Sequence, residues 1–160
     1  MDPLAYSARM PAPFGLVGVR TEGDALAEIA YLPPSAGELA PRNPVAAAAC
    51  RQIAAYLADP DFAFDLPLGA AGTPFQRRVW RKIAAIPRGR TRSYGELASE
   101  LGSSPRPVGQ ACGANRFPLV IPCHRVVAAG GIGGFAHHRT GFQLAVKRWL
   151  LRHEGVKLAA

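Results

Sequence analysis

Apolar and polar residues alternate near the N-terminus in a pattern that predicts a β-hairpin. Residues 14–19 and 26–32 are both rich in apolar side chains, and Thr21-Glu-Gly-Asp24 separates them. Apolar positions that alternate on either side of a short Gly-containing turn are typical of paired antiparallel strands. The first third of the chain is therefore expected to contain a small sheet.

The first helix is predicted after this hairpin. Asn43 precedes Pro44, which is typical of a helix start with Asn as the cap and Pro at the first helical position. Residues 45–57 are alanine-rich, and Val45, Ala49, Ile53 and Tyr56 lie about one helical turn apart. Cys50 falls inside this helix, where core packing is its expected role.

A small flexible segment, Gly69–Gly72, comes next, and we place a domain boundary before it, between residues 1–67 and 68–160. Thr73 and Pro74 then predict another capped helix start. The helix that they begin has apolar residues at helical spacing on one face and cationic residues on the other, which is typical of a surface helix.

Two short helices are predicted in the middle of the second part. Ser93 and Glu96 have the spacing of a capping box, which begins a helix that runs to about Leu101. Residues 102–105 contain Gly and Pro and interrupt this helix, and a second helix is expected over residues 106–114. Two helices joined by a short Gly-containing turn form the helix-turn-helix pattern.

The last predicted helix covers residues 143–153. Its apolar side is expected to carry Val146, Trp149 and Leu150. Its opposite, polar side is expected to carry Lys147, Arg148 and Arg152.

Composition is that of a globular protein, because 49% of the 160 residues are hydrophobic and 19% are charged. No apolar run reaches the length of a membrane-spanning helix, and the first ten residues lack the features of a leader peptide. We therefore expect a cytoplasmic protein with no membrane partner. The spacing of Cys50, Cys112 and Cys123 matches no zinc site or disulfide framework. This predicts a reducing compartment, no bound metal and no cofactor.

Positive charge is concentrated in the second part of the chain. Residues 1–67 hold four Arg or Lys against eight Asp or Glu, whereas residues 68–160 hold fifteen against three. Sixteen of the nineteen basic residues are arginine, whose guanidinium group suits forked contacts with phosphate. The split predicts that the second part binds a nucleic acid.

Candidate chemistry lies at Ile121-Pro-Cys-His-Arg-Val126. A free thiol near pKa 8.5 is only a few per cent thiolate at neutral pH, so a neighbouring base activates it. His124 directly follows Cys123 and is the candidate base. Cys112 lies on a predicted helix near Val108 and is expected to be a buried structural residue. A thiol and a base within the basic part of the chain predict nucleophilic chemistry on a nucleic acid.

Further motifs accompany this element in the second part of the chain. They lie at Gly72–Trp80, Ile86–Tyr94, Arg106–Gly109, Asn115, Ile121–Val126 and Arg152–Gly155. Together these segments resemble the O6-alkylguanine-DNA alkyltransferases, also called methylated-DNA–protein-cysteine methyltransferases. The resemblance covers the C-terminal half in order, and the Pro-Cys-His-Arg-Val element is highly specific.

The resemblance implies an α+β fold of two parts. Residues 1–67 would form a small α/β subdomain like that of ribonuclease H. Residues 68–160 would form a mainly helical domain with a winged helix-turn-helix. The protein would be a monomer that lies with the nucleoid when it is bound to DNA.

The resemblance also implies the function, which is repair of O6-alkylguanine in duplex DNA, with O4-alkylthymine as a further substrate. The alkyl group would pass irreversibly to Cys123, so each molecule would act once. His124 would activate Cys123 through a bridging water, Glu154 would orient His124, and Asn115 would hold the turn that carries the cysteine.

Contacts with DNA are implied in the same way. Tyr94 would press on the phosphate 3′ to the lesion and rotate the nucleotide out of the helix, and Arg106 would fill the vacated stack. Small residues of the second helix, Gly109 and Ala114 among them, would allow close approach to the minor groove. The extruded base would lie in a pocket formed by Pro118, Val126 and Phe135.

Three alternatives stay open. A lesion-recognition protein would flip alkylguanine without transferring the alkyl group, although relatives of that kind carry another residue in place of Cys123. A thiol hydrolase would use Cys123 and His124 on a small ester or amide. A transcription regulator would need the metal-binding methyl-sensor domain of some relatives, which this sequence lacks.

Overall fold

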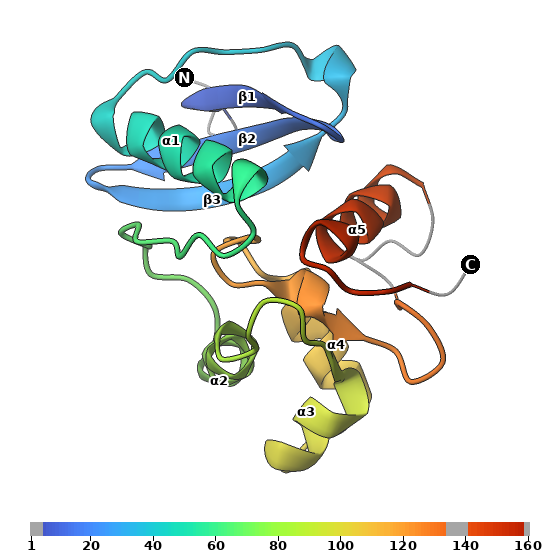
Figure 1. Ribbon diagram of the computed structural model, residues 1–160. Helices are drawn as coiled ribbons and strands as arrows, with labels where there is room; N and C mark the ends of the chain where they lie inside the picture. The colour runs from blue at the N-terminus through green and yellow to red at the C-terminus, as the bar shows by residue number, and fades with distance from the viewer. Residues whose placement is uncertain (1–4, 134–140, 159–160) are drawn as a thin grey trace. The chain divides into compact units, whose positions relative to one another are not determined.

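The computed structural model describes residues 5–133 and 141–158. They belong to two compact units, and the boundary between the units falls between Ala70 and Ala71. It is a mixed structure of helices and small sheets (Figure 1). Within the described residues, none of the helices combines the length and the apolar character needed to cross a bilayer.

The first unit contains a three-stranded antiparallel sheet in the order β1-β2-β3. Its strands are β1 (Ala8–Ala12), β2 (Gly15–Glu22) and β3 (Ala25–Leu32). The predicted hairpin is confirmed by β2 and β3, in which Val19 pairs with Ile29. Strand β1 was not predicted. Ala8, Met10 and Ala12 alternate with Arg9 and Pro11, but a proline in so short a run argues against a strand, and pairing with β2 defines it. Pro11 fits there because β1 is an edge strand.

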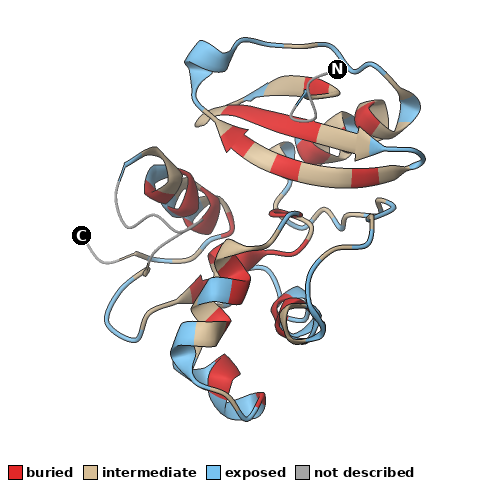
Figure 2. Cartoon of the chain, turned by 180° about the vertical axis from the view of Figure 1, so that it is seen from behind, coloured by how far each residue is buried: buried red, intermediate tan, exposed pale blue. Residues whose placement is uncertain are grey.

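Helix α1 (Pro44–Ala58) covers one face of this sheet, and a short 3-10 turn, η1 (Pro34–Ala36), precedes it (Figure 1). The predicted cap is confirmed, since the Asn43 side chain accepts a hydrogen bond of 2.8 Å from the backbone N–H of Ala46. The helix buries its inner face against the sheet, and the central strand β2 is the most buried (Figure 2). Cys50 lies at the margin of this core and is half-buried.

The second unit is mainly helical. Its helices are α2 (Pro74–Ala84), α3 (Tyr94–Glu100), α4 (Pro105–Gly113), the one-turn 3-10 helix η2 (Cys123–Arg125) and α5 (Phe142–His153). Two very short strands, β4 (Arg92–Ser93) and β5 (Val126–Val127), pair in parallel. This pair ties the start of α3 to the end of η2.

Local capping fixes where two of these helices begin. Thr73 with Gln76, and Ser93 with Glu96, each form a capping box in which both reciprocal hydrogen bonds are made. Both helix starts predicted from the sequence are therefore confirmed. Helices α3 and α4 pack on one another across the turn at residues 101–104, where Gly102 adopts a φ of 63° that favours glycine.

Helix α2 packs against α4 through its apolar face. The indole N–H of Trp80 donates a hydrogen bond of 2.8 Å to the backbone carbonyl of Ala111 on α4. Val79 and Ile83 are buried beside it, whereas Arg77 and Arg81 are exposed, as the amphipathic pattern predicts.

Helix α5 corrects one prediction. Lys147 was expected on the polar side, but its side chain is fully buried. Leu144 precedes it by three positions and Leu151 follows it by four, so all three residues share one face of the helix. The buried stripe of α5 is wider than the apolar residues alone indicate.

Candidate active site

Cys123 begins η2, directly after a buried stretch that ends in Pro122. Its thiol side chain is buried, with 6% of the residue surface exposed. The preceding chain turns tightly, because the N–H of Ile121 bonds to the carbonyl of Phe117 at 2.8 Å. Leu119 lies inside this turn with a φ of 77°, a conformation that non-glycine residues rarely adopt.

Asn115 holds the same turn from inside. Its side-chain N–H donates to the carbonyl of Ile121 at 2.8 Å, and its side-chain oxygen accepts from the N–H of Phe117 at 2.9 Å. An amide that bonds both ends of a loop fixes the loop's shape. Asn115 therefore positions the backbone that leads into Cys123.

His124 and Glu154 lie together in the interior. The imidazole Nε2 lies 2.9 Å from Oε2 of Glu154. The residues expose 1% and 0% of their surface respectively. Glu154 comes from the end of α5, so the tertiary fold brings these two groups together across thirty positions of sequence.

Burial controls the protonation of both reactive groups. It raises the pKa of the Cys123 thiol, and this effect is opposed in part by a hydrogen bond from Asn115 and by the charge of Lys147. Burial likewise lowers the pKa of His124, against the opposing effect of Glu154. At neutral pH the resting groups are therefore a protonated thiol and a neutral imidazole, which can accept a proton.

Lys147 is a site residue that the sequence analysis missed. Its ammonium group donates a hydrogen bond of 2.8 Å to the carbonyl of Val126 and lies 6.0 Å from the centre of the Tyr94 ring. Burial lowers its pKa to about 8, while Cys123 and Cys112 act in the opposite direction. Its helical spacing from Leu144 and Leu151 was the sequence feature that could have indicated its burial.

We predict that Lys147→Met slows alkylation of Cys123 by iodoacetamide about tenfold at pH 7. Loss of the buried cation removes a charge that favours the thiolate, and a rise of one pKa unit lowers the thiolate fraction about tenfold. Mass spectrometry of the Cys123 peptide over time measures the rate. The control is Lys157→Met, which removes an exposed lysine; equal rates in the two variants would contradict the prediction.

The residues expected to contact DNA lie on α3 and α4. Tyr94 is the first residue of α3 and is half-buried. Arg106 is exposed in the first turn of α4. Gly109 is half-buried, and a Cβ atom there would meet nothing within 4 Å. Ala114 ends the helix, directly before Asn115.

The expected pocket walls are placed in part. Pro118 and Val126 are buried near the ends of the turn that carries Cys123, and Phe135 lies outside the described residues. Gly133 packs closely on Tyr94, since a Cβ atom at Gly133 would lie 3.1 Å from the ring. Its φ of 74° also favours glycine.

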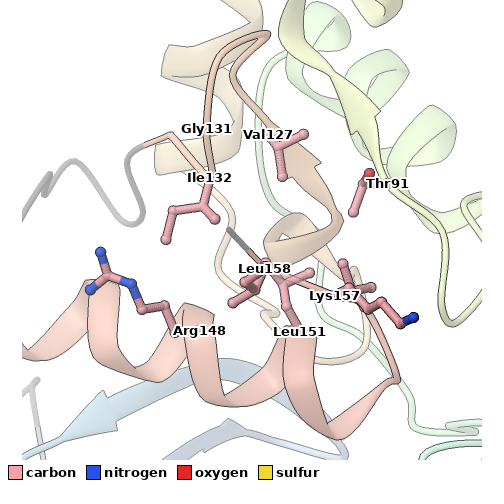
Figure 3. Close-up of a pocket in the computed structure, with 9 residues that line it drawn as sticks. Thr91, Val127, Gly131, Ile132, Arg148, Leu151, Lys157 and Leu158 are labelled. Atoms are coloured by element: carbon pink, nitrogen blue, oxygen red, sulfur yellow. The ribbon is translucent and has the colours of Figure 1, made fainter. Parts of the chain in front are cut away.

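A separate pocket of about 310 Å³ lies beside β5 and the C-terminal end of α5 (Figure 3). Val127 lines it, whereas Cys123 and Val126 do not. Successive residues of a strand point to opposite faces, so Val126 and Val127 face different sides of β5. This pocket is therefore distinct from the surroundings of the thiol.

Comparison with known proteins places this site in a wider context. The sequence model of the 6-O-methylguanine DNA methyltransferase DNA-binding domain matches residues 74–156. A methylated-DNA–protein-cysteine methyltransferase of Mycolicibacterium paratuberculosis is 49% identical over 92 residues, which are 56% of each chain. The chain thus spans about half the length of the curated relatives that it matches.

Solved structures extend the similarity to almost the whole chain. The O6-methylguanine methyltransferase of Mycobacterium tuberculosis is 32% identical, with a TM-score of 0.75 and coverage of 94% of this chain and 93% of that one. A structure of the M. tuberculosis protein in complex with DNA is 33% identical, with a TM-score of 0.74 and coverage of 91% and 90%.

Proposed function

Because this chain belongs to the 6-O-methylguanine DNA methyltransferase family, we propose that it repairs DNA by moving an alkyl group from O6 of guanine to Cys123. Each molecule acts once, since the thioether that forms is stable. The single observation that best supports this proposal is the buried thiol of Cys123, next to His124, which is paired with Glu154.

The chemistry requires a soft nucleophile that is shielded from water. His124 takes the proton from the thiol, and the sulfur then attacks the alkyl carbon. A bond forms between sulfur and carbon as the bond between carbon and O6 breaks, and its electron pair passes to the guanine. The proton released from the thiol neutralises the guanine at N1. The products are S-alkylcysteine and an intact base, so neither oxidant nor metal is consumed.

The target atom is inaccessible inside a duplex, so the base must leave the stack at a cost of about a few kcal/mol. We propose that α3 and α4 act as the helix-turn-helix of a winged domain and dock in the minor groove. In this arrangement Tyr94 rotates the nucleotide and Arg106 fills the gap. The excess of basic residues in 68–160 supports docking through phosphates, which is independent of sequence. We propose O4-alkylthymine as a second substrate. We also propose that the first unit has a ribonuclease H-like fold.

Mass spectrometry after incubation with a duplex that contains O6-methylguanine tests this function. We expect one added methyl group, located on the Cys123 peptide, and none with an undamaged duplex. Tight binding of the damaged duplex without a change in protein mass would instead favour a lesion-recognition protein. Turnover of a small ester or amide without methylation would favour a thiol hydrolase.

A further inference from the structure

One carboxylate at the site serves two partners. Glu154 Oε2 lies 2.9 Å from His124 Nε2 and also accepts a hydrogen bond of 2.8 Å from an Nη atom of Arg125. Arg125 Nε donates to the other oxygen, Oε1, at 2.9 Å. The guanidinium group therefore grips the carboxylate by both oxygens, in the forked geometry that is the strongest form of this pair.

Arg125 is itself fixed by the fold. Its second Nη atom donates to the backbone carbonyl of Ile86 at 2.6 Å, and its side chain is only 13% exposed. Ile86 begins the turn after α2, and Arg88 in the same turn bonds the backbone carbonyl of Glu154 at 3.2 Å. The turn thus holds Arg125 and the end of α5 in one place.

The charges of Glu154 and Arg125 affect whether His124 can act as a base. A buried carboxylate next to His124 favours the protonated form of the imidazole, because its negative charge stabilises the imidazolium. An imidazolium already carries the proton and cannot act as a base. Burial lowers the pKa of His124, and the Arg125 cation, which offsets the Glu154 charge, acts in the same direction. Lys147 on α5 also lowers the pKa of His124. The other titratable group next to His124 on η2 is Cys123.

We propose that Arg125 is a positioning residue that neutralises Glu154 and thereby keeps His124 uncharged and ready to accept the Cys123 proton. Glu154 can then orient the imidazole without holding a proton on it. The inference rests on the proposed alkyl transfer, but it concerns the protonation of His124, which can be measured without that reaction.

The test compares two substitutions that differ in charge. Arg125→Gln keeps a hydrogen-bonding group and removes the cation, whereas Arg125→Lys keeps the cation and loses the fork. Arg88→Met is the matched control, since it removes a cation that bonds the backbone carbonyl of Glu154 from the same turn. Two measurements are made on each protein: the pH dependence of single-turnover methyl transfer, and the titration of ¹³C-labelled His124 by NMR, with the signal identified from a His124→Asn variant.

Activity should rise with pH as His124 loses its proton. In Arg125→Gln both the activity midpoint and the His124 titration should move upward by about one pH unit or more, as expected when a nearby cation is lost. In Arg125→Lys the rate should fall while both midpoints stay at the wild-type position, and Arg88→Met should leave them unchanged.

Unshifted midpoints in Arg125→Gln, or an equal shift in Arg125→Lys, would overturn the proposal. If Arg125→Gln does not fold, a shifted midpoint in Arg125→Lys alone still contradicts it. If the wild-type protein transfers no methyl group, the proposed function fails, and the His124 titration still decides the role of Arg125.

Discussion

Cys123→Ser should repair no O6-methylguanine, with transfer reduced on the order of 10³-fold or more, the scale typical of losing a nucleophile. A serine hydroxyl is a much weaker acid than a thiol, so the neutral imidazole of His124 cannot generate the attacking anion at neutral pH. Serine has nearly the same shape as cysteine, so the buried turn that holds position 123 should keep its structure.

The measurement is restoration of guanine in a labelled duplex, followed at equal protein and DNA concentrations. Binding to the damaged duplex is measured in parallel and should be retained, because the groups proposed to contact DNA are unchanged. Cys50→Ser is the matched control, since Cys50 is half-buried in the other unit. Full repair by Cys123→Ser, or loss of repair in Cys50→Ser, would refute the role of Cys123.

Glu154→Ala should destabilise the protein by about 3–5 kcal/mol, the usual loss when one partner of a buried ion pair is removed. Glu154 is fully buried, and its removal leaves the Arg125 guanidinium without its carboxylate. The same change frees the imidazole of His124, so methyl transfer should also slow. Chemical denaturation measures the change in the free energy of unfolding, and single-turnover kinetics measure transfer.

Glu100→Ala is the control for this prediction. Glu100 pairs with Arg92 and Lys82 on the surface, where water and salt screen the charges. Its loss should change stability far less than the loss of Glu154. Similar losses in the two variants would show that the buried carboxylate is not a central support of the second unit.

Local chemistry made several features predictable from sequence. The Asn43, Thr73 and Ser93 caps each act on a backbone N–H three residues ahead, so neighbouring residues alone decide them. The β2–β3 hairpin was predictable for the same reason, since a short turn joins its strands. The Pro-Cys-His-Arg-Val segment also identified the candidate nucleophile without a structure.

Contacts between distant residues required the tertiary structure. Strand β1 is defined by its pairing with β2, whereas Pro11 within its five residues argues against a strand from the sequence alone. Lys147 is buried because its Nζ reaches the carbonyl of Val126, 21 positions away. A lysine is ordinarily exposed, so sequence alone assigned it to the solvent side.

The sequence by itself determined the helix starts, the charge division and the thiol with its adjacent histidine, because these depend on neighbouring residues or on simple composition. Only the tertiary structure decided that Arg125 and His124 share the Glu154 carboxylate, and that Arg125 also bonds Ile86, 39 positions away. The physical reason is that burial makes each charge require a partner, and the fold alone determines which distant groups are close enough to provide one.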